Sequence, residues 1–151
     1  MREEVIQLLI TEAAKARQMA YAPYSGYLVG AALVVPSGKI YTGCNVENAS
    51  YGLTNCAERT AIFKAVSEGQ RHIDAIAIVG GPIDSGVGEV TEMPDYAYPC
   101  GACRELMLQL DKDSKNIKFL TNTDTYEYVT MEELMPNWWG YSRFQEKNTN
   151  E

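Results

Sequence analysis

The sequence lacks any long hydrophobic run. No apolar stretch approaches the ~20 residues that a membrane-spanning helix requires, because Gly, Pro or a charged residue interrupts each candidate. The first nine residues alternate charged with apolar side chains and do not form the apolar core of a secretory signal. We therefore expect a cytoplasmic protein with no membrane partner.

Clusters of basic residues are also missing. The 13 Lys and Arg residues are scattered through a chain that has 20 Asp and Glu residues and a net charge of −7. A protein that holds a polynucleotide usually neutralises several phosphates with clustered Lys and Arg. The composition therefore favours a small-molecule substrate and no nucleic acid partner.

Cysteine and histidine are scarce, with four cysteines and one histidine in 151 residues. In a reducing compartment, four cysteines more often bind a metal or lie buried than form disulfides. His72 precedes an apolar segment and stands apart from the cysteines, so we expect it at the surface. A chain of this length buries roughly 70% of its unfolded surface and needs no disulfide scaffold.

Helical and strand-like patterns alternate along the chain without a repeat or linker, which predicts one domain over residues 1–151. Helical spacing predicts helices over 3–19, 56–68 and 100–110 and a helical turn over 131–134. Short apolar or alternating runs predict strands over 28–35, 39–46, 73–79, 117–121 and 126–130. Residues 80–98 are expected to form a long loop. This order predicts an α/β fold, a three-layer α/β/α sandwich around a mixed five-stranded sheet.

Three of the cysteines stand at the starts of two predicted helices. Cys56 opens one helix, and Cys100 and Cys103 lie in the first turn of the next. Residues three apart lie on one helix face, so Cys100 and Cys103 can hold one zinc ion about 2.3 Å from each sulfur, with Cys56 completing the set. Three protein ligands leave tetrahedral zinc one position for water, which is typical of a catalytic site.

Glu58 follows Cys56 by two residues and provides a carboxylate that can move protons beside the metal. Three thiolates on Zn²⁺ leave a net charge of about −1, which weakens the ion as a Lewis acid. The positive ends of two helices offset part of that charge, and Arg59 can donate to a thiolate from outside the ligand set. We hypothesise that Arg59 restores the acidity of water at the site.

Other interpretations of these residues stay open. Alone, the Cys100-Gly101-Ala102-Cys103 segment is compatible with a redox dithiol or half of a structural zinc site. Cys44 could close a four-cysteine structural site, or it could lie buried in its strand. Glu58 alone is compatible with an exposed helix carboxylate. Together, the three cysteines and Glu58 match the signature of zinc deaminases with Cys in the His position.

Five motifs extend the pattern over nearly the whole chain, namely Pro23-Tyr24-Ser25, Val29 to Leu33, Gly43 to Ala49, Cys56 to Ala61 and Pro99 to Arg104. In these motifs the sequence resembles the small, homotetrameric, all-cysteine cytidine deaminases. The resemblance implies a cytoplasmic hydrolase of pyrimidine salvage that converts cytidine and deoxycytidine to uridine and deoxyuridine with release of ammonia. It also implies one Zn²⁺ per subunit and a homotetramer with shared active sites.

The resemblance implies a role for each site residue as well. Cys56, Cys100 and Cys103 would bind zinc, and Glu58 would shuttle protons between water, the ring and the leaving amine. The implied substrate contacts are Asn45 and Glu47 with the ribose hydroxyl, Tyr27 with the pyrimidine, the Ala57 amide with its carbonyl oxygen, and Ala49 and Tyr51 with a neighbouring subunit's site.

The chemistry of the implied sugar contacts agrees with a nucleoside, because Asn45 both donates and accepts while Glu47 accepts from hydroxyls and repels phosphate. Three rivals remain. A deaminase of a cytosine-containing antibiotic nucleoside should lack the Asn45-Val46-Glu47 segment, and a polynucleotide deaminase would need a basic groove. A non-catalytic zinc module would use Cys44 as the fourth ligand.

The chain departs from the family pattern at its periphery. Tyr27 stands where Phe is frequent, and Trp138 and Trp139 follow Pro136 where a terminal Phe is usual. We expect these two Trp residues to be exposed unless a subunit covers them. The loop over 80–98 is longer than typical, and its acidic residues could alter access to the site or the subunit contacts.

Overall fold

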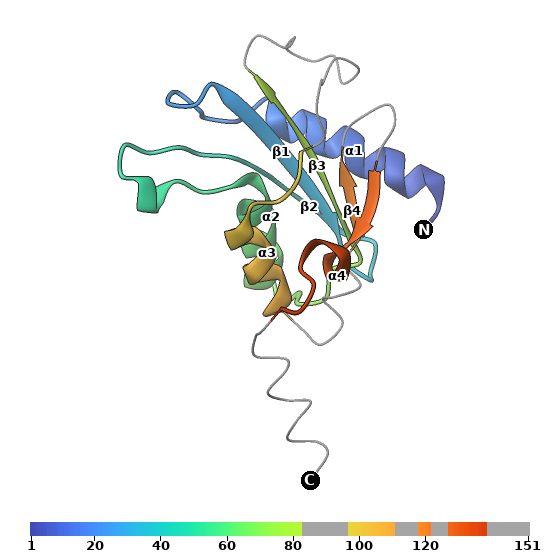
Figure 1. Ribbon diagram of the computed structural model, residues 1–151. Coiled ribbons are helices and arrows are strands. Elements are labelled where there is room, and N and C mark those ends of the chain that lie inside the picture. The colour runs from blue at the N-terminus through green and yellow to red at the C-terminus, as the bar shows by residue number, and fades with distance from the viewer. Residues whose placement is uncertain (83–96, 111–117, 122–126, 139–151) are drawn as a thin grey trace.

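The computed structural model describes residues 1–82, 97–110, 118–121 and 127–138 (Figure 1). Its helices are α1 (Glu3–Arg17), α2 (Ala57–Ser67), α3 (Gly101–Leu108) and α4 (Met131–Leu134), with a 3-10 turn η1 (Tyr51–Leu53). Its strands are β1 (Tyr27–Val34), β2 (Ile40–Cys44), β3 (Ala75–Pro82), β4 (Lys118–Thr121) and β5 (Glu127–Thr130). The α/β class expected from the sequence is confirmed.

The described strands form one sheet in the order β2-β1-β3-β4-β5. Strands β3 and β4 run parallel, whereas the other neighbouring pairs are antiparallel. The long pairing of β1 with β3, from Tyr27↔Pro82 to Val34↔Ala75, forms the centre of the sheet. Strand β3 is buried from Ala75 to Gly81, as the continuous apolar run of a central strand predicts.

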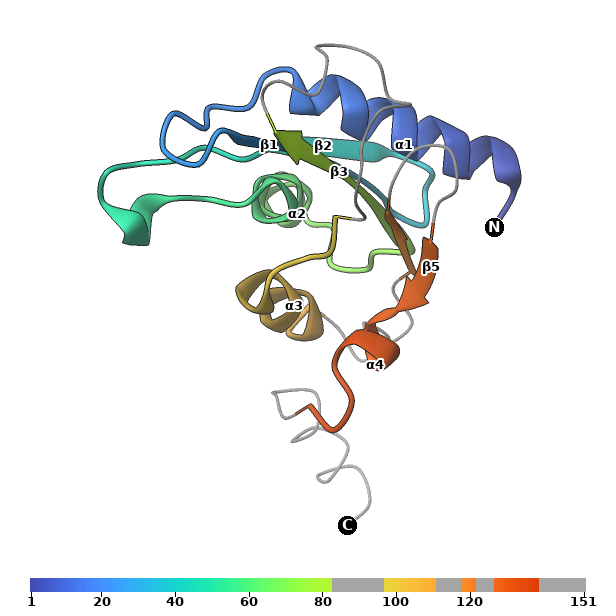
Figure 2. The same cartoon turned by 45° about the horizontal axis from the view of Figure 1, so that its top comes forward.

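Helices cover both faces of the sheet, and side-chain alternation along the strands creates the two cores. Ala31 and Leu33 belong to the core beneath α2 and α3, whereas Ala32 and Val34 belong to the core beneath α1. Figure 2 shows α1 on one side of the sheet and α2 and α3 on the other. Among the helices that the structure describes, none combines the length and the apolarity needed to cross a bilayer.

The C-terminal ends of β2 and β3 differ from those expected by two and three residues. Strand β2 ends at Cys44, and Val46 makes only isolated bridges with Tyr21 and Asn55, because the chain leaves the sheet edge there. Strand β3 extends to Pro82, so the expectation of a loop from residue 80 was wrong for residues 80–82. The two glycines resemble a turn in sequence, but the eight-residue β1 continues the ladder through them. The rest of that expected loop up to residue 96 lies outside the described residues.

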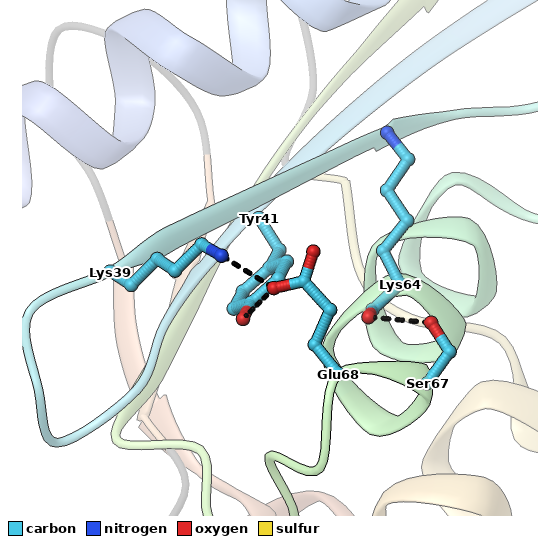
Figure 3. A network of polar contacts seen from close by, with 5 residues as sticks. All are labelled: Lys39, Tyr41, Lys64, Ser67 and Glu68. Carbon is cyan, nitrogen blue, oxygen red and sulfur yellow. Dashed lines mark hydrogen bonds and ion pairs between the residues drawn. The ribbon is translucent and has the colours of Figure 1, made fainter.

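The C-terminal end of α2 is tied to β2 by a polar network (Figure 3). Glu68, which follows α2, accepts a hydrogen bond from the Tyr41 hydroxyl at 2.7 Å and forms an ion pair with Lys39. The Lys39 ammonium also lies 4.9 Å from the centre of the Tyr41 ring. Lys64 of α2 reaches the Thr42 carbonyl of the same strand. These contacts hold α2 at the end opposite Cys56.

Replacement of Glu68 by Gln should lower the melting temperature at pH 7 by about 1–3 °C, because the amide loses its charged contact with Lys39. Hydrogen bonds from Lys39 and Tyr41 hold the pKa of the Glu68 carboxyl below its ordinary value. This contribution is therefore present above the unfolded-state pKa and is lost as the pH falls through the folded-state pKa. Thermal denaturation should show a difference from the parent protein at pH 7 that is smaller at pH 3.

The matched control is Glu12→Gln, which removes an exposed ion pair with Lys15 within α1. It should change the melting temperature less at pH 7, because it leaves the contact between α2 and β2 intact. A Glu68→Gln difference of the same size at both pH values would contradict the role assigned to this ion pair.

Candidate active site

Helices α2 and α3 begin side by side on one face of the sheet (Figure 2). Cys56 and Cys100 are the N-cap residues of α2 and α3, and both have extended backbone angles that end the incoming segment. Cys103 follows in the first turn of α3. The two helix starts therefore bring the three predicted ligands close to one another. The positive ends of the two helix dipoles lie at the same place.

The three sulfur atoms form one compact group. The Sγ atoms of Cys56 and Cys100 are 3.5 Å apart, those of Cys100 and Cys103 are 3.4 Å apart, and all three lie within 4.8 Å of one another. Three sulfurs around one tetrahedral zinc would be about 3.8 Å apart. The residues present therefore fit a single zinc ion. Cys44, also among the described residues, is not part of this group.

Hydrogen bonds among the three thiols favour the deprotonated form of Cys56. A hydrogen bond from Cys103, with further ones from Arg59 and Cys100, lowers the pKa of Cys56 to about 5. The same contact with Cys56, followed by burial, raises the pKa of Cys103. A metal ion requires deprotonated sulfur, so binding to all three would release the remaining protons.

Glu58 lies in the wall of the site and is only 4% exposed. The interpretation of Glu58 as an exposed helix carboxylate is therefore wrong. Its Oε2 lies 3.9 Å from the Cys103 sulfur. Burial raises the pKa of Glu58 to about 7, and the charge of Cys56 acts in the same direction. A carboxyl group with such a pKa can both accept and donate a proton near neutral pH.

Arg59 lies against the ligand group, as the charge argument requires. Its Nη2 donates to the Thr54 carbonyl at 3.2 Å and to the Cys56 sulfur at 3.5 Å. The bond to Cys56 also raises the pKa of Arg59. Its Nε is buried with no hydrogen-bond partner among the described residues. The guanidinium is thus placed to offset thiolate charge.

A cavity of about 360 Å³ opens beside these groups, a volume within the range of small-molecule sites. The predicted site residues that line it are Tyr27, Asn45, Glu47, Cys56, Ala57, Glu58 and Cys100. Sequence reasoning assigned no role to several other lining residues, namely Ser25, Val29, Thr54, Asn55, Ile78, Ala97 and Tyr98. Of these, Ser25 ends the Pro23-Tyr24-Ser25 motif, Val29 begins the Val29 to Leu33 motif, and Tyr98 directly precedes Pro99.

Asn45 and Glu47 are held in place by backbone groups. The Asn45 side chain accepts from the Val29 amide at 2.8 Å and donates to the Tyr27 carbonyl at 2.9 Å. These two bonds use one side-chain N–H and one lone pair, so the second of each can bind a ligand. Glu47 Oε1 accepts from the amides of Tyr24 and Ser25, both at 3.0 Å. Hydrogen bonds from Ser25, together with the Tyr24 amide, lower the pKa of Glu47 and so keep the carboxylate charged.

Ala49 and Tyr51 do not line the cavity that contains Glu58. Tyr51 is 85% exposed and lines an adjoining cavity of about 350 Å³. This second cavity shares Ser25, Glu47 and Thr54 with the first. Ala49 is exposed and lines neither cavity. The segment that carries both residues projects away from the helices (Figure 1).

The peripheral residues lie elsewhere. His72 pairs with Asp74 at 3.2 Å, and both side chains are partly exposed, as expected for a surface histidine. Trp138 is partly buried and packs against the core beneath α2 and α3. The expectation that Trp138 is exposed unless a subunit covers it was therefore wrong, because the chain's own core covers part of the side chain. Trp139 lies outside the described residues.

Residues 3–121 match the family model described as the cytidine and deoxycytidylate deaminase zinc-binding region. The chain belongs to this family. A curated cytidine deaminase of Halalkalibacterium halodurans is 46% identical over 86% of this chain and 90% of its own length. The match to a zinc-binding region agrees with the group of three cysteine sulfurs.

Two further relatives bear on the fold and the substrate. The crystal structure of a cytidine deaminase from Burkholderia pseudomallei superposes with a TM-score of 0.76, at 40% identity over 92% of this chain and 100% of that one. A blasticidin-S deaminase of Bacillus cereus is 34% identical over 72% of this chain and 74% of its length. Relatives of this chain are thus named as cytidine deaminases and as a blasticidin-S deaminase.

Proposed function

We propose that this protein catalyses the zinc-dependent hydrolytic deamination of cytidine and deoxycytidine to uridine and deoxyuridine in pyrimidine salvage. One observation carries the proposal. The buried Glu58 lies beside three convergent thiols in the same cavity as Asn45 and Glu47. Groups that could bind a metal, carry a proton and bind hydroxyls thus meet at one cavity of about 360 Å³, which supports the proposal.

Cys56, Cys100 and Cys103 would hold the zinc ion, one per subunit. When bound, zinc would supply a Lewis-acidic position at which water gives up a proton near neutral pH. Arg59 and the starts of α2 and α3 would offset the negative charge of the three thiolates. The partial exposure of Cys56 and Cys100 leaves this group open to the cavity.

Glu58 would carry every proton transfer of the reaction. It accepts a proton from the attacking water and passes it to N3 of the cytosine ring while oxygen adds at C4. It would then take the second proton, from the hydroxyl group now on C4, and deliver it to the exocyclic amine. The C4–N bond breaks, ammonia leaves and the C4 oxygen becomes the carbonyl of uridine. The pKa of about 7 supports this exchange, because both protonation states are then populated near neutral pH.

The remaining cavity residues would orient the nucleoside. Asn45 and Glu47 bind the ribose hydroxyl, and the charged Glu47 disfavours a substrate with a phosphate on the sugar. Tyr27 packs against the pyrimidine. The Ala57 amide stands at the first helical position of α2, where an N–H has no acceptor within the helix, so it can donate to the pyrimidine carbonyl.

The proposal extends to the whole chain. Residues 1–151 would form one domain, a three-layer α/β/α sandwich around a mixed five-stranded sheet, and four copies would assemble with shared active sites. Exposed apolar residues near the cavity support an assembly in which Ala49 and Tyr51 reach a neighbour, namely Tyr21, Tyr24, Val46, Tyr51 and Leu53. Four free cysteines suit the reducing cytoplasm.

Ultraviolet absorbance of the purified, zinc-loaded protein tests the proposal. Cytidine and deoxycytidine should be converted to uridine and deoxyuridine, whereas cytosine and cytidine monophosphate should react with kcat/KM at least ~100-fold lower. Cytosine lacks the sugar that Asn45 and Glu47 bind, and the monophosphate meets the Glu47 charge. Failure to deaminate cytidine would refute the proposal, and faster turnover of blasticidin S would favour the antibiotic-deaminase rival.

A further inference from the structure

Arg17, the last residue of α1, is a buried cation that sequence reasoning and the proposed mechanism leave unused. Its side chain is 6% exposed. The Nε donates to the Leu28 carbonyl at 3.1 Å, and Nη2 donates to the carbonyls of Gly81 at 3.1 Å and Pro82 at 3.0 Å. One guanidinium thus joins the start of β1 to the end of β3. Charged donors make the stronger class of hydrogen bonds.

The strand segment that Arg17 holds carries the cavity residue Tyr27. Strand β1 pairs with β2 only from Gly30 onward, so residues 27–29 extend beyond that ladder. On this side Asn45 takes the place of a strand, with bonds to the Tyr27 carbonyl and the Val29 amide. Carbonyls alternate in direction along a strand, so the Leu28 carbonyl faces the opposite edge, where Arg17 binds it. Asn45 and Arg17 therefore hydrogen-bond to the backbone of residues 27–29 from its two opposite edges.

The other strand held by Arg17 is the one on which the Tyr27 ring rests. A Cβ added at Gly80 would lie 2.9 Å from Cε1 of Tyr27 and 3.3 Å from the Cβ of Ala97. The ring therefore lies directly on the backbone of β3, next to another residue of the cavity wall. Arg17 binds the two carbonyls that follow Gly80. Both the strand that carries the ring and the strand beneath it are tied to one side chain.

Close packing of α1 on β1 brings the guanidinium within reach. A Cβ at Gly30 would lie 1.9 Å from the Ala13 carbonyl oxygen and 2.4 Å from the Arg17 backbone nitrogen. The helix backbone therefore rests on the strand, and its last residue stands over the strand ends. In contrast, Cys56 and Glu58 belong to α2 on the opposite face of the sheet.

We propose that Arg17 is a positioning residue that places the Tyr27 ring against the pyrimidine and so sets the affinity for the nucleoside. This inference rests on the proposed function. Because Tyr27 contacts the ring equally in the ground state and the transition state, loss of Arg17 should raise KM and spare kcat. The planar guanidinium of Arg donates to three carbonyls in fixed directions. The ammonium group of Lys, a point charge, should hold the same carbonyls less well.

Steady-state kinetics of Arg17→Gln with cytidine test the proposal. KM should rise about 10-fold while kcat stays within about 2-fold of the parent value, and Arg17→Lys should fall between the two. Lys15→Gln, which removes an exposed cation of the same helix turn, is the matched control and should change neither constant. In a Tyr27→Ala background, Arg17→Gln should alter KM less than about 2-fold, because the ring it positions is absent.

Hydrogen exchange measured by mass spectrometry gives a readout independent of turnover. Amides of residues 27–29 should exchange about 5-fold faster in Arg17→Gln, while those of α2 keep their parental rates. An unchanged KM, an equal rise of KM in the Tyr27→Ala background, or unaltered exchange over 27–29 would overturn the proposal. If Arg17→Gln fails to fold, Arg17→Lys is judged by the same criteria. A parent protein inactive on cytidine would instead refute the proposed function, and the exchange result would still decide whether Arg17 positions Tyr27.

Discussion

Replacement of Glu58 by Gln is expected to lower kcat for cytidine about 10⁴-fold, the upper end of what one acid–base group contributes. Gln keeps the shape of the side chain but can neither take a proton from water nor return one to the ring and the amine. KM should change far less, because the lost interaction acts in the transition state. Steady-state kinetics measure both constants, and elemental analysis should find zinc still bound.

The control is Glu68→Gln, which removes a carboxyl group just after the C-terminal end of α2 and should leave kcat unchanged. Burial already disfavours the charged form of Glu58, so Gln should not lower the melting temperature at neutral pH. Loss of turnover in a folded, zinc-loaded variant then reports on chemistry. Activity within about 10-fold of the parent would assign the proton transfers to another group.

Replacement of Cys103 by Ala is expected to remove both zinc and activity. Cys103 is fully buried, and its sulfur stands 3.4 Å from that of Cys100. With two of three thiolates left, zinc affinity should fall by at least ~100-fold, more than is lost with a supporting contact. Titration against a competing chelator measures the affinity, and turnover of cytidine should disappear with the metal.

Cys44→Ser is the matched control for that experiment. Cys44 belongs to the end of β2 and is not part of the described group of metal-binding sulfurs. This variant should keep zinc and turnover within about 2-fold of the parent values. Release of zinc from Cys44→Ser, with no deaminase activity in the parent protein, would favour a non-catalytic four-cysteine module.

Local sequence signals predicted the helices well and the strand ends less well. The turn α4 (Met131–Leu134) has the predicted bounds, and α2 and α3 begin one residue after their cysteine caps. Thr130 and Glu133 form a capping box at α4, which is a local device readable from sequence. The extent of β3 through residues 80–82 depends on its partner β1, and a pairing partner distant in sequence leaves no local pattern.

The sequence by itself determined the kinds of groups present, namely three thiols at two helix starts, a nearby carboxylate and an amide–carboxylate pair. It did so because helix starts and residue spacing are local properties. Only the tertiary structure decided that Glu58 is buried, that the three sulfurs lie within 4.8 Å, and that Arg17 spans two strands. Burial and convergence arise from packing between segments far apart in the chain, and a single sequence carries no separate signal for them.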